Sequence, residues 1–288
     1  MSVRSIHEKA HRISKEKPEL LKQGQQSSLY DNIKNKRQVD LNIEGGRRTY
    51  YVAEGDILLD ADQLSLYAAE QTERTEIVGI GAPTSGIIEL IGVTDDHGDF
   101  IKAASPISYC ILRKTMEESD YDFAKKHLTR AATDWEETCD VGFSYRAELD
   151  DSEPSIRPDG VTFVVRKIDA HGTFIAASFF PNDPPERRHL FLDPSFFQDT
   201  GYDPTGVLRH ELGHILGFRH EHISSGAPAI CPKEAVDHTI KLTEYDPHSV
   251  MHYFCGGVGS KTLHITDKDR GGAVRAYGPP TGSKRKIA

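Results

Sequence analysis

The second part of the chain has patterns of apolar and polar residues that predict a compact domain of strands and helices. Starting after Pro106, residues 107–113 (ISYCILR) have the β-branched and aromatic character of a strand. Residues 120–139 are predicted to form a helix. At a period of about 3.6 residues, one face of this helix carries apolar side chains: Ala124, Leu128, Ala131 and Trp135.

More strands and two more helices follow along the chain. Strand-like runs cover residues 141–147, 161–168, 173–180 and 189–193. A helix is predicted to start near Asp203, and a final helix is bounded by a capping box of Thr266 and Asp269 and by Gly278 as its stop. Strands first and helices interleaved predict an α+β or α/β domain with a twisted sheet.

The first part of the chain has a different texture. Residues 1–40 are polar and charged, which predicts a helix or a flexible arm. A short strand and turn are expected near residues 49–59, followed by a helix that Asp60 caps. We therefore predict an N-terminal accessory segment over residues 1–105, a main domain over 106–280 and a short tail over 281–288.

Composition excludes some classes of function. The chain has 288 residues with 35 basic and 44 acidic side chains, a formal net charge of -9, so a fold-wide basic surface for nucleic acid is not expected. No apolar run approaches the roughly 18 residues of a membrane helix, and no signal peptide is evident. We expect a soluble protein that is secreted or cytoplasmic. The sequence does not indicate its oligomeric state.

The cysteines leave the redox compartment open. Cys110, Cys139, Cys231 and Cys255 allow three pairings of two disulfides, and none of them forms a C-x-x-C pair typical of a zinc knuckle. Disulfides are therefore compatible with the sequence but not required by it.

The motif with the most chemistry is HELGHILGFRH at residues 210–220. His210 and His214 are four residues apart, so on a helix they project from one face and can reach one metal ion. Gly217 allows a left-handed turn that brings His220 toward the same ion. Three histidines with a fourth position left for water are typical of a catalytic zinc site.

Glu211 lies beside these ligands on the helical wheel. A zinc ion lowers the pKa of a bound water to about 7, and Glu211 is the predicted base that takes its proton and passes it to a leaving amine. The predicted reaction is metal-assisted hydrolysis of a peptide bond, and its partner is a protein or peptide substrate.

The pattern H-E-x-x-H-x-x-G-x-x-H, followed by a methionine turn, resembles the signature of the metzincin metallopeptidases. The turn is represented by residues 249–253, SVMHY, which we call the Met-turn. The resemblance implies a zincin-like catalytic domain with a twisted mixed sheet, an active-site helix and a C-terminal helix. Met251 would then form the hydrophobic floor beneath the zinc.

Among metzincins the chain looks most like the astacins, because Phe218, Glu221 and the S-x-M-H-Y turn match that family. The resemblance implies that Tyr253 is a fifth zinc ligand that swings away to stabilise the oxyanion; the alternative is that it packs behind the turn. It also suggests residues 189–193 as the edge strand that pairs with substrate. The interval from His220 to Met251 is short, and the cysteine pattern differs, although Cys231 and Cys255 bracket the Met-turn and could pair. A relative of the matrixins or serralysins therefore remains an alternative.

Astacins carry a pro-segment in which an aspartate reaches the zinc. Residues 53–59, AEGDILL, are similar to the surroundings of that aspartate, with Ala53 where a phenylalanine is expected. We therefore predict Asp56 as a zinc ligand of a latent form, which would make the chain a zymogen. The alternative is an ordinary Gly-Asp turn.

These observations predict a zinc-dependent endopeptidase in which His210, His214, His220 and Tyr253 bind zinc, and Glu211 and Tyr253 serve catalysis. A different class remains open. The chain could be a catalytically silent or permanently occluded binding protein that carries zinc in a protease-like cleft.

Overall fold

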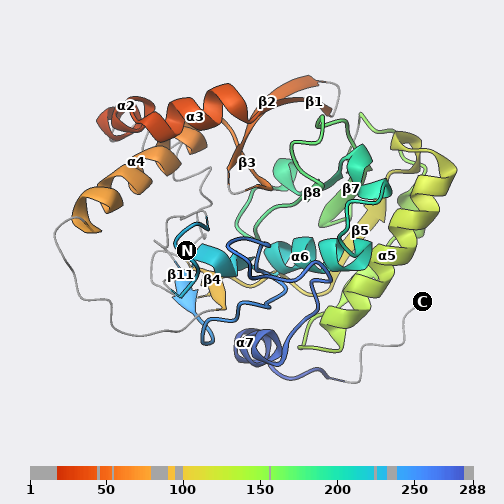
Figure 1. Ribbon diagram of the computed structural model, residues 1–288. Coiled ribbons are helices and arrows are strands. Elements are labelled where there is room, and N and C mark those ends of the chain that lie inside the picture. Colours follow the sequence, from red (N-terminus) through yellow and green to blue (C-terminus); the bar gives the residue numbers. More distant parts are fainter. Residues whose placement is uncertain are drawn as a thin grey trace.

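The computed structural model describes residues 18–43, 46–53, 55–78, 90–94, 100–155, 157–223, 226–231 and 239–281. Figure 1 shows the N-terminal elements along one side of the molecule, the active-site helix α6 through its middle, and helices α5 and α7 on the other sides. Residues 1–17 of the predicted arm and residues 282–288 of the predicted tail lie outside the described residues.

The N-terminal part is a small unit of helices and an antiparallel sheet. Its elements are α2 (Pro18–Gln25), α3 (Ser28–Lys36), β1 (Gln38–Ile43), β2 (Gly46–Ala53), β3 (Ile57–Leu59) and α4 (Ala61–Val78). The three strands pair in the order β1-β2-β3. Strand β1 alternates exposed and buried positions, with Val39, Leu41 and Ile43 inward, which is the period of a half-buried strand. Asp60 caps α4, as predicted, by accepting a hydrogen bond from the Gln63 amide.

The catalytic part is built on a mixed sheet with the strand order β6-β5-β7-β9-β8. Strands β5 (Ile107–Ile111), β6 (Phe143–Tyr145), β7 (Phe163–Lys167) and β9 (His189–Leu192) are parallel, and β8 (Ala176–Ala177) is antiparallel to β9. The expectation that residues 189–193 form the edge strand is wrong, because β9 lies between β7 and β8. The short strand β8 is at the edge instead, and sequence patterns do not encode which strands become neighbours.

Three helices pack around this sheet: α5 (Glu118–Glu136), α6 (Pro204–Ile215) and α7 (Asp267–Tyr277). The predicted apolar face of α5 is buried, and the Trp135 indole donates a hydrogen bond of 2.9 Å to the Arg209 carbonyl of α6. The predicted capping box of α7 is confirmed, with Gly278 at its end. Strands, helices and the mixed sheet together give the α+β architecture that the sequence predicts. Short 3-10 turns connect these elements at Arg113–Thr115, Ala147–Leu149, Pro185–Arg187, Pro194–Phe197 and Glu221–Ile223.

A second small sheet has the order β10-β4-β11 and joins distant parts of the chain. Strand β4 (Ile91–Val93) pairs with β10 (Phe218–Arg219), directly after the HELGH helix, and with β11 (Thr239–Lys241). The Phe100 ring stacks on Phe218, with 5.7 Å between the ring centroids. Strand β4 and Phe100 therefore pack with elements of the second part of the chain, although the predicted division lies at residue 105.

The N-terminal sheet docks on the catalytic part through an apolar interface. Its inward side chains form one buried cluster with residues near β8 and β9: Val39, Leu41, Ile43, Tyr50, Val52 and Leu58 on one side, and Ala170, Phe174, Ala177 and Phe191 on the other. Because this interface removes apolar area from water, it holds the N-terminal unit against the edge of the catalytic sheet.

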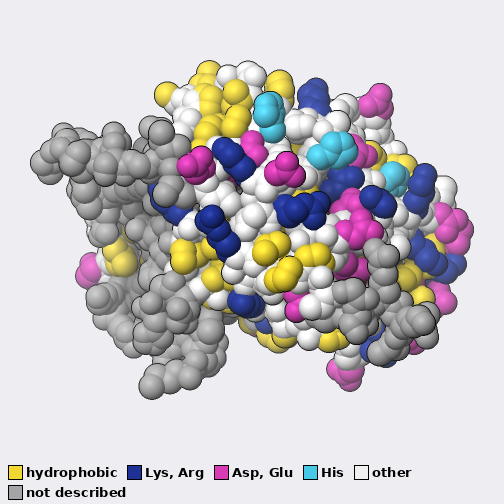
Figure 2. All heavy atoms as spheres, turned by 90° about the horizontal axis from the view of Figure 1, so that it is seen from below, with side chains coloured by type: hydrophobic (Ala, Val, Ile, Leu, Met, Phe, Trp, Pro, Cys, Tyr) yellow, Lys and Arg dark blue, Asp and Glu magenta, His cyan; other side chains and the backbone are white. Residues whose placement is uncertain are grey.

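The face of the molecule in Figure 2 carries acidic and basic side chains interspersed, and neither sign dominates it. None of the helices in the described ranges combines the length and apolar composition that a bilayer crossing demands.

Candidate metal centre and active site

Helix α6 carries His210, Glu211 and His214, whose side chains lie in the interior of the protein. Asp203 caps the helix by accepting hydrogen bonds from the amides of Thr205 and Gly206, and Pro204 occupies its first turn. This start agrees with the predicted one. All three side chains of the motif are at most 3% exposed. The helix therefore holds ionisable groups in the interior, where they require partners.

Backbone carbonyls orient the first two imidazoles. The Nδ1 atom of His210 lies 2.8 Å from the Val250 carbonyl oxygen, and Nδ1 of His214 lies 2.8 Å from that of Phe218. A carbonyl only accepts, so each Nδ1 carries the hydrogen. Each Nε2 then presents a lone pair, which is the arrangement that second-shell carbonyls give to metal-binding histidines.

His220 reaches the same point from another direction. The chain turns at Gly217, whose φ of +94° is in the left-handed region that favours glycine. The Nε2 atoms of His214 and His220 are then 3.1 Å apart, and both rings are buried. Burial lowers the pKa of His214 to about 4, which favours the neutral form that binds a metal.

Asp56 of the N-terminal unit lies against all three imidazoles. Its carboxylate oxygens are 3.3 Å from Nε2 of His210, 3.8 Å from that of His214 and 3.2 Å from that of His220. Asp56 is 5% exposed. Burial raises the pKa of Asp56, but the charge of His220 and hydrogen bonds from the three imidazoles outweigh burial and hold this pKa well below its usual value.

These four groups fit a zinc ion. One ligand atom from each of Asp56, His210, His214 and His220 lies within 4.8 Å of the others, and all four residues are buried. Three imidazole nitrogens and one carboxylate oxygen are donors that zinc accepts in tetrahedral sites. The structure thus brings together the three predicted histidines and the predicted Asp56.

Glu211 is buried beside the cluster. Burial, and then the charge of Asp56, raise the pKa of Glu211 well above its usual value. Ser178, which follows strand β8, donates a 3.0 Å hydrogen bond to the Glu211 carbonyl oxygen and so ties the helix to the edge of the sheet. Within the described residues, Oε2 of Glu211 has no hydrogen-bond partner, so one carboxylate oxygen is available to a substrate or a water.

The Met-turn lies beneath and beside the histidines. Met251 is fully buried under helix α6, where a Cβ at Gly213 would come within 2.4 Å of its sulfur. The Tyr253 ring packs on the imidazoles, with its centroid 4.5 Å from that of His220 and 5.4 Å from that of His210. These contacts bring Met251 and Tyr253 to the site, and the role of Tyr253 as a ligand stays a prediction.

A disulfide between Cys231 and Cys255 closes the loop beside the Met-turn, with sulfurs 2.01 Å apart. Cys255 lies two residues after Tyr253. Cys110 and Cys139 are free and buried. Of the pairings that the sequence allowed, the structure has the one that joins the two cysteines bracketing the Met-turn.

Sequence reasoning missed the residues that support the site from a distance. Asp269 accepts hydrogen bonds from the Ser249 hydroxyl at 2.6 Å and from the Val250 amide at 2.9 Å, and so holds the Met-turn. Arg209 pairs with Asp134 of helix α5 at 2.6 Å. No local pattern signals these contacts. The capping box that includes Asp269 was visible in the sequence, but its second role depends on the tertiary fold.

Comparisons with known proteins agree with this geometry. The family model described as Matrixin, of the M10 peptidases, matches residues 101–255. Two Caenorhabditis elegans proteins are similar over shorter stretches. They are zinc metalloproteinase nas-3, 33% identical over 89 residues, and zinc metalloproteinase nas-2, 35% identical over 71 residues. The two alignments cover 28% and 22% of this chain, and 30% and 23% of the relatives' own lengths. The chain therefore spans less than a third of the length of each of these relatives.

Among solved structures, one of myroilysin matches with a TM-score of 0.45 and 14% sequence identity, over 65% of this chain and 98% of that chain. The matched region of the family model contains the HELGH helix, His220 and the Met-turn, so the similarity covers the whole candidate site except Asp56.

Proposed function

Since the chain belongs to the matrixin family of metallopeptidases, we propose that it is a zinc-dependent endopeptidase held latent by its N-terminal segment. The observation that carries this proposal is the convergence of three buried imidazoles and the Asp56 carboxylate beside the buried Glu211. The substrate class is protein or peptide. Among the metzincins as a whole, the S-x-M-H-Y turn favours an astacin-like form of this site.

His210, His214 and His220 would hold the zinc ion through their Nε2 atoms. A zinc ion at this site supplies Lewis acidity, which makes hydroxide available from a bound water and polarises the scissile carbonyl. Glu211 takes the proton of the attacking water and later delivers it to the leaving amine. Tyr253, whose ring packs on His220, is proposed as an auxiliary ligand and as a donor to the oxyanion that develops at the carbonyl.

Asp56 is proposed to block this chemistry in the uncut chain. Its carboxylate lies where a water or substrate oxygen would have to approach the three imidazoles. An ordinary Gly-Asp turn would leave the aspartate in solvent, whereas this side chain is buried among the histidines. Such burial supports a zymogen whose inhibitory part is the N-terminal unit from α2 to α4. Strand β4, although within the predicted segment of residues 1–105, pairs with β10 and β11.

The test is hydrolysis of a generic protein substrate by the zinc-loaded chain, before and after a cut that separates the N-terminal segment. We expect slow turnover before the cut, faster turnover after it, and loss of turnover with a zinc chelator. The Glu211→Ala variant should retain zinc but lose about 10²–10⁴-fold in rate. Asp122→Ala, at an exposed acidic position of helix α5, is the control and should keep full activity.

Two outcomes would contradict the proposal. Turnover that persists in Glu211→Ala would refute the general base. No turnover from a cut chain, or from Asp56→Ala, with one zinc bound per chain would favour the alternative of a silent zinc-bearing binding protein.

A further inference from the structure

Arg187 makes its main contacts with the N-terminal unit rather than with its own domain. Its Nη1 atom lies 3.2 Å from the Asp60 carboxylate, and Nη2 donates a 2.5 Å hydrogen bond to the Leu58 carbonyl. The guanidinium also lies over the Tyr50 ring, 5.4 Å from its centroid. All three partners belong to the segment that carries Asp56.

These contacts lie close to the metal centre along the chain. Leu58 follows Asp56 by two residues and Asp60 follows it by four. An extended chain advances about 3.3 Å per residue, so the carbonyl that Arg187 binds is within about 7 Å of Asp56 along the segment. Arg187 therefore binds the stretch of the N-terminal segment that directly follows Asp56.

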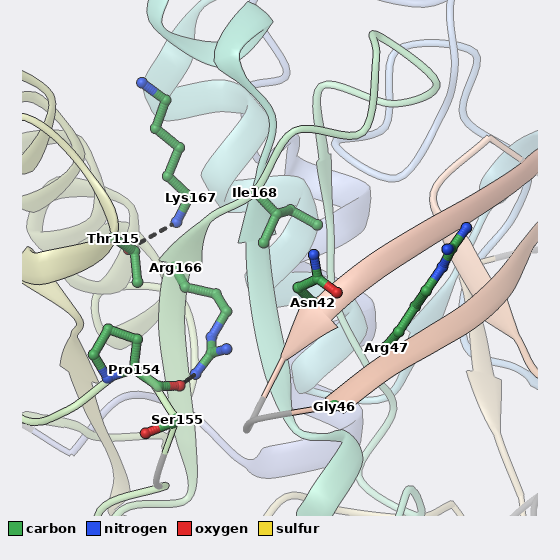
Figure 3. Close-up of a pocket in the computed structure, with 9 residues that line it drawn as sticks. All are labelled: Asn42, Gly46, Arg47, Thr115, Pro154, Ser155, Arg166, Lys167 and Ile168. Atoms are coloured by element: carbon green, nitrogen blue, oxygen red, sulfur yellow. Dashed lines mark hydrogen bonds between the residues drawn. The ribbon is translucent and has the colours of Figure 1, made fainter.

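The rest of the docked hairpin is held mainly by apolar side chains and fits less closely at its far end. A cavity of about 440 Å³ lies there, between β1–β2 and strand β7. Figure 3 shows Asn42, Gly46 and Arg47 of the hairpin on one side of it, and Arg166 and Ile168 on the other. Near Asp56, by contrast, Arg187 binds both a carboxylate and a backbone carbonyl of the segment.

Arg187 would lose these partners when the segment departs. Its side chain is only 10% exposed in the uncut chain. Within the catalytic part, it has Asp183 at 3.8 Å, and one oxygen of that carboxylate already accepts a hydrogen bond from the Phe180 amide. A guanidinium presents five donors in a planar fork that suits a carboxylate. Oδ1 of Asp183 would stay near Nε, whereas Nη1 and Nη2 would lose Asp60 and the Leu58 carbonyl and become available to another carboxylate.

We propose that Arg187 is a specificity-determining residue, which binds the carboxylate of an acidic side chain in the substrate after the segment leaves. In the uncut chain Asp60 occupies this subsite. The inference rests on the proposed function in one respect, since it requires the N-terminal segment to vacate the cleft. The substrate class is thereby narrowed to peptides with Asp or Glu a few residues from the cut bond.

The test uses a full chain with the recognition sequence of a specific protease inserted between Val78 and Leu90, cut after folding. The catalytic fragment then retains its own main core, which lies in residues 90–276. Binding is measured by fluorescence anisotropy in a Glu211→Ala background, which prevents turnover. The probe is a labelled peptide copying residues 50–63, and its matched control carries Asn in place of Asp60.

We expect the Asp peptide to bind about tenfold tighter than the Asn peptide, as a charge-assisted contact at a partly buried site implies. Arg187→Gln should abolish this difference, and Arg187→Lys should keep part of it. Arg130→Gln, which removes a positive charge from the exposed side of α5, should leave the difference unchanged. Equal affinities for the two peptides, no binding of either, or a preference that survives in Arg187→Gln would overturn the proposal.

Turnover by the same cut chain with Glu211 intact tests the proposed function separately. Cleavage sites in a mixed peptide library should be enriched in Asp or Glu near the cut bond, and Arg187→Gln should lose that enrichment. If the cut chain binds the peptides with an Arg187-dependent preference but hydrolyses nothing, the peptidase proposal fails and the subsite stands. If the cut chain hydrolyses the library but shows no enrichment of Asp or Glu near the cut bond, the proposed subsite is refuted and the proposed peptidase activity is supported.

Discussion

Gly55 lies directly against the phenol of Tyr253. A Cβ built on Gly55 would come within 3.0 Å of the Tyr253 oxygen and 3.2 Å of its Cζ. The φ of Gly55 is +108°, in the region that residues with a side chain rarely adopt. The residue before Asp56 therefore has both a conformational and a steric reason to be glycine, and the contact joins the N-terminal segment to the Met-turn.

Gly55→Val should loosen the seating of Asp56. Backbone strain of this kind costs about 1–3 kcal/mol, and about 1.4 kcal/mol corresponds to a tenfold change in population. We expect turnover by the uncut, zinc-loaded chain to rise about tenfold in an assay with a quenched fluorescent protein substrate. Gly46→Ala is the control, because its Cβ would meet nothing closer than 4.0 Å. If the uncut Gly55→Val chain turns over substrate no faster than the unchanged chain, the contact between Gly55 and Tyr253 does not contribute to inhibition.

Much of the site was predictable because its signals are local. The spacing of His210 and His214 follows from the helical period, and the helix itself is bounded by Asp203 and Gly217. The Gly55-Asp56 pair was visible only through a resemblance to pro-segments. That Asp56 lies among the imidazoles depends on docking of the N-terminal sheet, which no spacing in the sequence encodes.

Other features depended on tertiary contacts. The run at residues 173–180 predicted a strand, but only Ala176–Ala177 pair, and Phe174 and Phe179 are buried in two different clusters. Strand β1 (Gln38–Ile43) begins inside residues 1–40, whose charge predicts a helix or a flexible arm. The role of Arg187 could not be foreseen, since its partners are more than 120 residues away.

Gly213 in the HELGH helix should tolerate no side chain. A Cβ there would lie 2.4 Å from the Met251 sulfur and 3.4 Å from Cζ2 of Trp135, and both side chains are fully buried. Gly213→Ala should therefore destabilise the chain by about 1–3 kcal/mol through overpacking. Gly271 in α7 is the matched helical control, because its Cβ would meet nothing within 4 Å.

Gly271→Ala should be neutral or stabilise by about 0.5–1 kcal/mol, since alanine loses less backbone entropy in a helix. Chemical denaturation monitored by Trp135 fluorescence compares the two variants. If the free energy of unfolding changes equally in Gly213→Ala and Gly271→Ala, the close packing of Met251 against α6 does not limit stability.

The free thiols should be unreactive in the folded chain. Burial raises the pKa of Cys110 and of Cys139 to about 12, so very little thiolate forms at pH 8. A thiol-reactive dye should label no cysteine in the native protein, two after denaturation without reductant and four after denaturation with reductant. Labelling of four cysteines without reductant would contradict the Cys231–Cys255 disulfide.

Asp269 should stabilise the metal centre without touching it. It is 1% exposed and accepts hydrogen bonds from the Ser249 hydroxyl, the Val250 amide and the Thr266 amide. The Val250 carbonyl in turn orients His210 through its Nδ1. Loss of the carboxylate therefore leaves buried donors without acceptors at the segment that positions a metal ligand.

Asp269→Ala should lower the free energy of unfolding by about 3 kcal/mol and weaken zinc binding about tenfold. Asp269→Asn keeps one carbonyl acceptor, so its free energy of unfolding and its zinc affinity should both fall less than in Asp269→Ala. Asp267→Ala, in the exposed first turn of the same helix, controls for changes in α7 itself. Competition with a chromogenic chelator measures zinc affinity, and denaturant titration measures stability. If Asp269→Ala unfolds more easily but binds zinc with unchanged affinity, the carboxylate supports only the fold, and the Met-turn keeps its place by the packing of Met251.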